Sequence, residues 1–329
     1  MGSTRNKLIS LLAENTDQYI SGQLLSEKLN ISRSAIWKHM KELEKDGYEI
    51  EGKSRKGYRI ISFPDKLSEN TLKWGLKTEW LGKTIIHKDT TESTQFIAHQ
   101  AAQEGAVHGT VVIADEQTKG KGRMNRQWHS APNKGIWLSI ILRPMLQPYL
   151  AAQLTLLTAT VLADVIKEHV QVEPQIKWPN DILIDGKKTV GILTEMQAEQ
   201  DQIQYVVIGM GINVNQTKEE MPEDIQHRAT SLRIESGREW DIKTLIQQIL
   251  PAFEKAYATY MESGFPPVKE KWESYGFKIG ETIQIKTMQN EWQSEFLGIA
   301  EDGALIANDK NGKQVNLYSA EIEWFKEGS

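Results

Sequence analysis

The segment Thr118–Trp128 contains residue types suited to binding a phosphate group that is attached to a flat ring. Its two glycines let backbone N–H groups approach a ligand closely. The apolar run Thr110–Ala114 before it is typical of a buried strand, so we expect a loop that leaves a sheet. Cations and a stacking face in such a loop suit a nucleotide; the alternative is a solvated basic surface loop. The side chains concerned are Lys119, Lys121, Arg123, Arg126 and Trp128.

A second group of polar side chains occurs in the stretch Lys177-Trp-Pro-Asn-Asp181. Proline does not fit a central strand, so the chain must bulge or turn at Pro179 and present Lys177, Asn180 and Asp181. A lysine, an amide and a carboxylate at a kink suit a site for phosphate and Mg²⁺. The alternative is that Asn180 and Asp181 only close a turn. Lys188 begins the next predicted strand, where a solvated lysine is the usual outcome.

Two further segments are candidates for contact with a small polar ligand. The segment Thr90–Gln95 leads into a predicted helix, and its hydroxyl and amide groups either bind a ligand or cap the helix. Gly209 and Gly211 interrupt the apolar strand Tyr205–Asn215. Glycine weakens a strand unless another body approaches the backbone closely, and that body is either a ligand ring or a packed helix.

The sequence excludes or disfavours several other classes of site. With no cysteine, the chain cannot form disulfides or thiolate metal sites and has no cysteine nucleophile. The motif Gly-x-x-x-x-Gly-Lys-Ser/Thr is absent and Gly209 and Gly211 do not open a helix, which disfavours P-loop and dinucleotide sites. No two histidines have metal-ligand spacing, and the Gly-x-Ser-x-Gly motif of serine hydrolases does not occur.

A sheet is needed to position the polar residues of the central region. From Thr84 onward, strand and helix patterns predict an α/β domain around a mixed sheet. Helices are expected over 96–104 and, almost wholly apolar and buried against the sheet, over about 148–169. The expected strands span 84–87, 110–114, 135–142, 189–195 and 205–215.

The C-terminal part of the chain predicts a helical segment followed by a small β-barrel. The helical pattern covers about 241–275 and is broken at Phe265-Pro-Pro267. Short strands separated by Asp-Gly and Asn-Gly turns then follow from Gly280, a pattern typical of a barrel. The expected strands are 282–286, 291–299, 304–307 and 315–317.

The N-terminal region predicts three helices and a hairpin. The first helix ends near Asn15, the second spans Gly22–Leu29, and the third runs from an N-cap at Ser32 to about Asp46. A hairpin over Tyr48–Ile60 follows. This order is that of a winged helix-turn-helix; the alternative is a small helical protein-interaction module. The second-helix side chains expected to face inward are Leu24, Leu25 and Leu29.

In a winged helix-turn-helix, the third helix enters the major groove and the hairpin touches phosphate. The side chains predicted to contact DNA are therefore Arg33, Ser34, Trp37, Lys38 and Lys41 on the helix, and Lys53, Arg55 and Lys56 on the wing. Residues 1–62 carry 11 Lys or Arg and 8 Asp or Glu, a charge of +3, whereas the remaining 28 and 36 give −8. A basic N-terminal region followed by an acidic remainder agrees with DNA binding by the N-terminal region alone.

The overall composition is that of a soluble protein with two or three domains. The chain has 329 residues, of which 39% are hydrophobic and 25% charged. No signal-peptide pattern and no uninterrupted apolar run of membrane length occurs, so a cytoplasmic location is expected. We predict domains over 1–64, 65–275 and 276–329.

Five segments together resemble the bacterial biotin protein ligases that also repress the biotin operon. They are TESTQ at 91–95, EQTKGKGRMNRQW at 116–128, KWPNDI at 177–182, KKTVGIL at 187–193 and IGMGINVN at 208–215. Their order and spacing match the family over essentially the whole chain. The resemblance implies an α+β multidomain fold: a winged helix-turn-helix, a central mixed-sheet ligase domain similar to class II synthetases, and an SH3-like C-terminal barrel.

The resemblance also implies the reaction. Such enzymes join the carboxylate of biotin to the α-phosphate of ATP, release pyrophosphate and hold biotinyl-5′-AMP. A lysine of an acceptor domain then attacks the acyl carbon, and AMP leaves. Mg²⁺ is the implied cofactor, with no prosthetic group. No covalent enzyme intermediate is needed, which fits the lack of an obvious nucleophile.

The resemblance also implies which residues of this chain bind the substrates and act in catalysis. For biotin they are Ser93, Thr94, Gln95, Gln117, Lys121, Gly122, Arg123, Lys188, Gly209 and Gly211. For ATP and the adenylate they are Gly120, Lys121, Arg123, Trp128, Asn180, Lys188 and Asn213. Of these, Trp128 would stack on adenine. The implied catalytic residues are Arg123, Lys188 and Asp181, the last steering the incoming lysine, and the Mg²⁺ ligands are Asn180 and Asp181.

The implied partners are a biotin carboxyl carrier domain of acetyl-CoA carboxylase and of other biotin-dependent carboxylases, and operator DNA of biotin biosynthesis or transport genes. We expect a homodimer to form when ligand binds, and we expect no membrane partner. Two alternatives remain: a ligand-sensing regulator without catalysis, and a ligase for a related acid such as lipoate. The chain departs from the family at Lys121, which replaces an arginine, and at Met124-Asn125, which replace Arg-Gly. We expect changed loop flexibility there.

Overall fold

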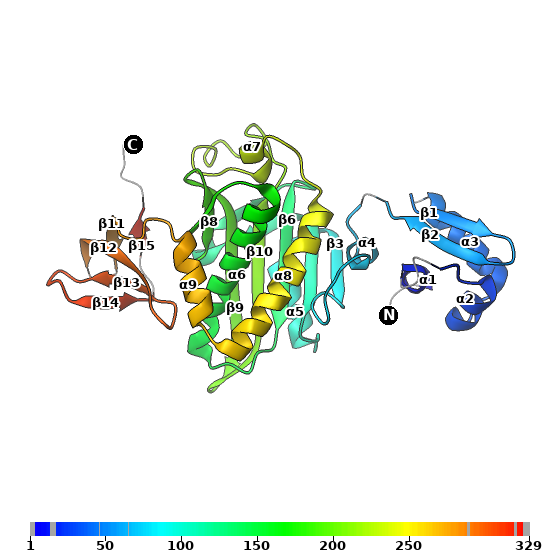
Figure 1. The fold of residues 1–329 in the computed structure, drawn as a ribbon, viewed down its shortest axis with the longest axis horizontal. Helices are drawn as coiled ribbons and strands as arrows, with labels where there is room; N and C mark the ends of the chain where they lie inside the picture. The colour runs from blue at the N-terminus through cyan, green and yellow to red at the C-terminus, as the bar shows by residue number, and fades with distance from the viewer. Residues whose placement is uncertain are drawn as a thin grey trace. The chain divides into compact units, whose positions relative to one another are not determined.

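The computed structural model describes residues 4–13, 18–45, 47–64, 66–287, 290–318 and 321–324. The chain divides into two compact units, residues 1–76 and 77–329 (Figure 1). Two predicted helix ends, Asn15 and Asp46, lie outside the described residues.

The first unit has the predicted winged helix-turn-helix order. It contains α1 (Thr4–Ala13), α2 (Gly22–Leu29), α3 (Arg33–Lys45), β1 (Glu49–Lys53), β2 (Gly57–Ser62) and α4 (Glu69–Lys73). Ser32 Oγ accepts from Ala35 N at 3.2 Å, which confirms the predicted cap of α3. Leu25, Ile36 and Met40 fill the core with apolar residues of α1 and β2. The inward orientation predicted for Leu24 is wrong, since that side chain is 43% exposed.

The first unit also continues past the predicted boundary at residue 64. Trp74 follows α4 and stacks on Phe63, with ring centroids 4.2 Å apart. Because this aromatic contact ties the segment after the wing to the helix-turn-helix core, the compact unit ends at Leu76.

The second unit is built on the predicted mixed sheet, in the order β3-β4-β6-β10-β9-β8-β7 with β5 paired to β4. Strands β3 and β4 are parallel and the other pairs are antiparallel. The strands are β3 (Ile85–Thr91), β4 (Thr110–Lys121), β5 (Gln127–Ser130), β6 (Gly135–Leu142), β7 (Pro174–Lys177), β8 (Asp181–Ile184), β9 (Lys187–Glu199) and β10 (Gln202–Asn213).

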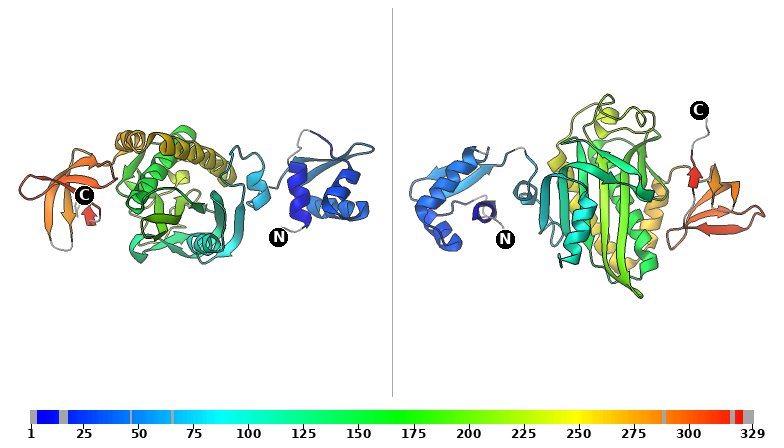
Figure 2. Two further views of the ribbon diagram at one scale, coloured as in Figure 1. Left: turned by 90° about the horizontal axis from the view of Figure 1, so that it is seen from below. Right: turned by 180° about the vertical axis from the view of Figure 1, so that it is seen from behind.

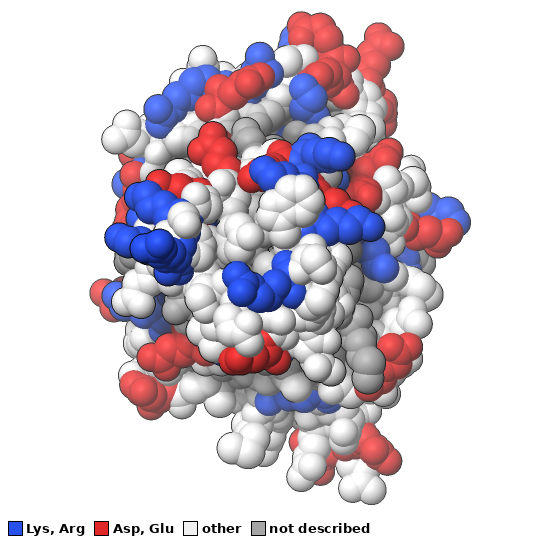
Figure 3. All heavy atoms as spheres, turned by 90° about the vertical axis from the view of Figure 1, so that its right-hand side faces the viewer, with Lys and Arg blue, Asp and Glu red and all other residues white. Residues whose placement is uncertain are grey.

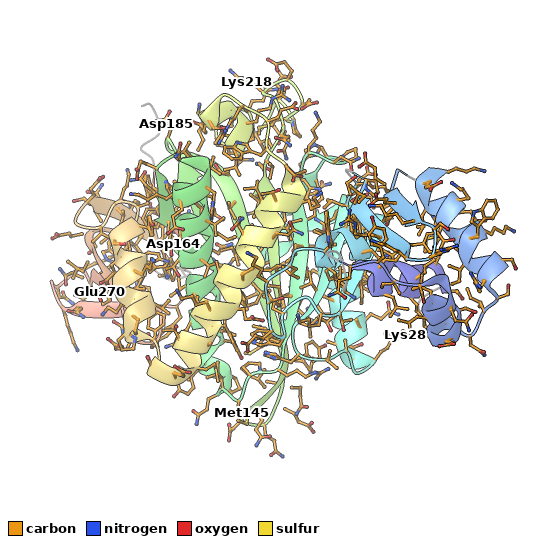
Figure 4. All side chains as sticks on the ribbon, turned by 45° about the vertical axis from the view of Figure 1, so that its right-hand side comes forward. Lys28, Met145, Asp164, Asp185, Lys218 and Glu270 are labelled. Carbon is orange, nitrogen blue, oxygen red and sulfur yellow. The ribbon has the colours of Figure 1, made fainter. Side chains whose placement is uncertain are left out.

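Helices cover the two faces of this sheet unequally. One face is covered by α6 (Ala151–Val165), α8 (Ile242–Ser263) and α9 (Pro266–Tyr275), and within the described ranges α5 (Thr94–Gln103) is the one α-helix on the other (Figures 1 and 2). Seen from behind in Figure 2, β9 and β10 are not covered by a helix. The short α7 (Leu232–Ser236) and the segment with Lys218 lie at one end of the sheet and Met145 at the other (Figure 4).

The apolar helix predicted over about 148–169 is a core helix. By length and composition alone, Pro148–Val170 could cross a membrane, yet 72% of its most apolar window is buried within the fold. It comprises the 3₁₀ turn η2 (Pro148–Leu150), α6 and the π-helical turn η3 (Ile166–Val170). Packing of α6 on helices α8 and α9, and on strands β9 and β7 of the sheet, accounts for that burial.

The C-terminal strands form an antiparallel sheet in the order β14-β13-β12-β11-β15. The strands are β11 (Thr282–Lys286), β12 (Glu291–Ile299), β13 (Leu305–Asn308), β14 (Gln314–Leu317) and β15 (Glu321–Glu323), of which β15 was not predicted. Trp178 Nε1 donates to Gly303 O at 3.1 Å, so the turn between β7 and β8 is tied to this sheet.

The loop predicted over Thr118–Trp128 is shorter than expected. Strand β4 continues to Lys121 and β5 begins at Gln127, so the irregular part is Gly122–Arg126 with the 3₁₀ turn η1 (Arg123–Asn125). Gly122 N donates to Arg126 O at 2.7 Å and closes this loop. The glycines and charges of this segment predict a loop, but pairing with β3 and β5 keeps it in the sheet.

Candidate functional site

Three glycines expose backbone on the face of the sheet that carries α5. Gly209 pairs with Leu193, and Gly211 pairs with Gly191, in the antiparallel pair of β10 and β9. Cross-strand partners and alternate residues of a strand point to the same face, so the glycines share one face. All three are partly exposed. We call Gly191, Gly209 and Gly211 the glycine shelf.

Two side chains lie against the glycine shelf. A Cβ atom on Gly211 would lie 2.6 Å from the indole of Trp128, and one on Gly191 would lie 2.7 Å from the same ring. A Cβ on Gly209 would lie 2.6 Å from Gln95 Oε1. The close approach expected at Gly209 and Gly211 is thus made by side chains from α5 and β5.

Trp128 is positioned at the shelf by the return of the chain in β5. It pairs with Gly120, where a Cβ would lie 2.4 Å from the carbonyl oxygen of Trp128. Lys188 Nζ lies 5.1 Å from the centroid of the indole. Among the described residues the buried indole N–H has no hydrogen-bond partner. The buried donor is therefore unsatisfied where the indole lies on the glycine shelf, and adenine stacking by Trp128 stays a prediction.

Side chains predicted to contact the small acid belong to one hydrogen-bonded chain. Gln117 Oε1 accepts from Thr94 N at 2.8 Å and lies 3.1 Å from Thr94 Oγ1. Thr94 Oγ1 lies 2.9 Å from Ser139 Oγ, which donates to Gln95 Oε1 at 3.1 Å. At the other end, Gln117 Nε2 donates to Ser130 Oγ at 2.8 Å. We call Gln95, Ser139, Thr94, Gln117 and Ser130 the polar chain.

Two other predicted ligand contacts flank the polar chain. Ser93 is 2% exposed and occupies the N-cap position of α5, but its side chain makes no capping bond there. Its hydroxyl is therefore not required by the helix. Lys121, at the end of β4, is exposed to solvent.

A cluster of charges lies where β8 begins. Asp181 is 9% exposed, and its Oδ1 lies 2.7 Å from Lys188 Nζ and its Oδ2 3.6 Å from Lys177 Nζ. Arg123 Nη1 donates to Asn180 Oδ1 at 3.3 Å. The sheet thus brings β7, β8, β9 and the loop after β4 to one place. We call Arg123, Lys177, Asn180, Asp181 and Lys188 the charge cluster.

The charge cluster has an excess of positive charge. Burial lowers the pKa of Lys177, Asp181 opposes this shift, and the nearby charges of Lys188 and Arg126 lower the pKa further. Burial also lowers the pKa of Arg123, and the negative charge of Asp181 again opposes this shift. Three cations around one carboxylate suit an anionic ligand, whose charge would relieve their mutual repulsion.

The residues predicted to ligate Mg²⁺ do not form a metal site by themselves. Asp181 already faces two lysine ammonium groups, and the Asn180 oxygen accepts from Arg123. A dication would have to displace these cations, and Mg²⁺ requires an octahedral set of oxygen ligands. We therefore derive no catalytic step through a metal bound by Asn180 and Asp181.

The two asparagines predicted near the adenylate are held by the fold. Asn213 Nδ2 donates to Thr230 O at 3.0 Å, and Asn213 Oδ1 accepts from Gln216 Nε2 at 3.0 Å. Asn180 Nδ2 donates to Ile192 O at 2.8 Å. Both amides thus fix segments beside the shelf, and direct ligand contact by either stays a prediction.

Sequence reasoning missed two residues of the site. Ser139 and Ser130 are buried members of the polar chain, whereas Lys177, expected beside a phosphate, does lie in the charge cluster. Ser139 is the one polar residue in a strand that otherwise reads as core, Gly135–Leu142, and that isolation was an available signal. Ser130 carried no comparable signal, because it follows a loop in sequence.

The predicted DNA contacts are exposed side chains of α3 and the wing. Trp37 is 56% exposed. Lys41 pairs with Glu44 at 2.6 Å and Lys53 with Glu51 at 3.1 Å, so part of the basic charge is already neutralised. In the view of Figure 3, Lys and Arg side chains form several separate groups and not one continuous field. Arg55 adopts a left-handed conformation, with φ of 65°, at the tip of the wing.

Known families match all three parts of the chain. A model of the biotin/lipoate A/B protein ligase family matches residues 87–213. An HTH domain model matches residues 4–59, and a model of the biotin protein ligase C terminal domain matches residues 278–324.

Similar proteins and structures agree with these matches. The bifunctional ligase/repressor BirA of Bacillus subtilis is 47% identical over 97% of this chain and 98% of its own length. The protein of the same name from Escherichia coli is 27% identical over 96% and 97%. Among solved structures, biotin protein ligase from Aquifex aeolicus in complex with biotin and ATP is 28% identical, with a TM-score of 0.63, covering 73% of this chain and 99% of that chain.

Proposed function

The chain belongs to the family of bifunctional biotin ligases and repressors, and from this premise we propose how its two units divide the work. The second unit attaches biotin to a carrier protein at the expense of ATP. The first unit binds operator DNA. The observation that carries the first part is that the polar chain and the charge cluster belong to one sheet and meet at Trp128: its carbonyl accepts from Ser130 Oγ at 3.4 Å, and its indole centroid lies 5.1 Å from Lys188 Nζ.

In the first step, a carboxylate oxygen of biotin attacks the α-phosphate of ATP, the bond to the β-phosphate breaks, and pyrophosphate leaves. Both reactants are anions, so fixed cations are needed to bring them together and to stabilise the charge that develops on phosphorus. Lys188 and Arg123 supply these cations. Asp181 holds Lys188 at 2.7 Å, so the ammonium group does not have to be ordered during the reaction.

Biotin lies with its cyclic urea at Thr94 and Gln117 and with its carboxylate toward Lys188 and Arg123. The urea needs both hydrogen-bond donors and acceptors, which hydroxyl and amide side chains supply. Trp128, whose indole lies on the glycine shelf, borders this site. ATP enters as its Mg²⁺ complex, with the ion carried by the phosphates.

In the second step, the amine of a carrier-domain lysine attacks the acyl carbon, and the bond to AMP breaks. The attacking amine must lose a proton, and AMP leaves with the electron pair of the acyl–oxygen bond. Asp181 steers the incoming ammonium group by charge, in competition with Lys177 and Lys188. The carrier domain of acetyl-CoA carboxylase and those of other biotin-dependent carboxylases are the proposed acceptors.

One assay tests the ligase function directly. Purified protein is incubated with ATP, Mg²⁺, an apo carrier domain, and either labelled biotin or labelled lipoate. We expect label on the carrier from biotin alone. Transfer from lipoate alone would favour a ligase for that acid, and transfer from neither would leave a regulator without catalysis.

The first unit binds operator DNA of biotin biosynthesis or transport genes, with biotinyl-5′-AMP as co-repressor. Binding of the adenylate orders the loop at Gly122–Arg126, promotes a homodimer in the cytoplasm, and places two winged helices on a palindromic site. Operator affinity should fall steeply with salt and rise when the adenylate is added. An affinity indifferent to the adenylate would remove the co-repressor role.

A further inference from the structure

Ser139 is an unusual residue for its position. It lies in the middle of β6, where every residue is buried, and it is the only hydroxyl in that strand. Its own exposure is 0%. A hydroxyl in such a place costs free energy unless it is hydrogen-bonded. A packing role alone would be served better by alanine or valine.

The partners of Ser139 are two residues that face the proposed biotin ring site. Its hydroxyl donates to Gln95 Oε1 at 3.1 Å and lies 2.9 Å from Thr94 Oγ1. Gln95 is thereby turned so that Nε2 donates to Val207 O at 3.2 Å. Since a side-chain amide presents a donor at one end and an acceptor at the other, the proton of Ser139 selects the end that faces inward.

Thr94 transmits the same orientation to the next member of the polar chain. Its backbone N–H and its hydroxyl both lie within hydrogen-bond distance of Gln117 Oε1. Gln117 Nε2 in turn donates to Ser130 Oγ at 2.8 Å. Ser130 is 4% exposed and follows Trp128 by two residues in the sequence. Trp128 itself lies on the glycine shelf. The hydrogen-bonded chain thus runs from the centre of the sheet to β5, the strand that contains Trp128.

We propose that Ser139 is a positioning residue that makes the site selective for acids carrying a cyclic urea. The inference rests on the proposed biotin ligase function. Ser139 does not touch the ligand; it holds Thr94 and Gln95 in the one arrangement in which their donors and acceptors match a urea. Ser130 holds the far end of the same chain. A site organised to hydrogen-bond a substrate discriminates strongly, because a mismatched ligand leaves its buried polar groups unpaired.

The test is Ser139→Ala, assayed in the full-length enzyme for adenylation of biotin and of desthiobiotin, which keeps the cyclic urea and lacks the sulfur ring. We expect KM to rise about tenfold for both acids, with kcat changed less than about threefold and KM for ATP unchanged. Ser130→Ala, at the end of the chain, should raise KM for biotin by about threefold.

The matched control is Ser294→Ala, which removes another buried, hydrogen-bonded serine, in the C-terminal sheet. It should lower thermal stability and leave KM for biotin unchanged. The proposal is overturned if Ser139→Ala leaves KM for biotin unaltered, or if KM for biotin and for ATP rise together, as a general loss of structure would require. A wild-type enzyme that fails to adenylate biotin would instead remove the proposed function.

Discussion

The two functional regions treat their polar groups in opposite ways. In the polar chain, Ser139 is 0% and Thr94 4% exposed, and their hydroxyls are hydrogen-bonded within the protein. On the DNA-binding face, by contrast, Trp37 is 56% exposed. The side chains of Lys41 and Lys53 are each 51% exposed although both are ion-paired.

This difference predicts different kinds of sensitivity. Buried hydrogen bonds are not screened by salt, but they depend strongly on geometry, so small changes of shape should be costly. Surface ion pairs contribute about 0 to 1 kcal/mol and weaken with ionic strength. The ligase region should therefore respond mainly to shape, and the DNA-binding region mainly to charge and salt.

The largest effect is expected for Lys188→Ala. Removing this cation should slow adenylation by about 100-fold, because its charge acts on the transition state. Biotin affinity should change by no more than about threefold, since the cyclic urea is held elsewhere. Single-turnover adenylation and equilibrium binding separate the two quantities. Lys187→Ala is the matched control and should be near wild type; equal losses of rate and affinity in Lys188→Ala would contradict the assigned role.

Gly211→Ala should have the next largest effect, through shape alone. The added Cβ would lie 2.6 Å from the indole of Trp128, so the ring must leave the glycine shelf. We expect kcat/KM for biotin to fall about tenfold, as for other overpacked sites. In a Trp128→Ala background the same change should cost less than about twofold, because the clash is gone. Additive losses would show that Trp128 does not lie on the shelf.

The matched change in the other region is Gly52→Ala. There a Cβ would make only ordinary contact with Tyr58, at 3.7 Å. DNA affinity and stability should both stay close to wild type. If Gly52→Ala were as damaging as Gly211→Ala, the contrast between a shape-sensitive and a shape-tolerant region would be lost.

Much of the fold could be predicted from sequence because its signals are local. The predicted helix Gly22–Leu29 and strand Gly135–Leu142 coincide with α2 and β6. The extension of β4 to Lys121 could not be predicted, since it depends on pairing with β3 and β5 and not on the propensities of Lys119 to Lys121. Leu24 was misjudged because the apolar stripe of α2 is ambiguous between adjacent positions.

The site was predicted unevenly for a related reason. Family motifs identified Thr94, Gln117 and Lys188, whose types and spacing are distinctive. They did not include Ser139, whose isolation in an apolar strand marks it as unusual but does not show which side chains it contacts. Nor did the sequence show that Asp181 is flanked by Lys177 as well as Lys188, which removes the expected metal site. Both depend on which strands become neighbours.

A smaller effect is expected for Lys38→Ala on α3. Lys38 is exposed on the same helix as Lys41, whose charge is already paired with Glu44. Loss of Lys38 should lower operator affinity by about tenfold and reduce the slope of affinity against salt by about one. Lys41→Ala should have a weaker effect. Ligase activity should not change in either variant; a change would show that the two regions are not separable in this respect.

The smallest effect concerns Glu51, which anchors the wing. Its carboxylate accepts from Tyr19 and from Arg59 at 2.8 Å, and pairs with Lys53 at 3.1 Å. The hydrogen bond from Tyr19, followed by that from Lys53, lowers the pKa of Glu51 from 4.5 to about 2. A carboxyl with a depressed pKa stabilises the fold at pH values above 4.5, and this stabilisation is lost progressively as the pH falls to about 2.

Glu51→Gln should therefore destabilise the wing slightly, by an amount constant between pH 7 and 5 and shrinking below pH 4.5. Hydrogen exchange of the β1 and β2 amides in the full chain measures this difference without requiring global unfolding. Because the carboxylate is at the surface, high salt should reduce the effect, whereas the loss of biotin affinity in Ser139→Ala should be indifferent to salt. A Glu51 carboxyl that titrates near 4.5 by NMR would mean that Tyr19, Lys53 and Arg59 do not hold it.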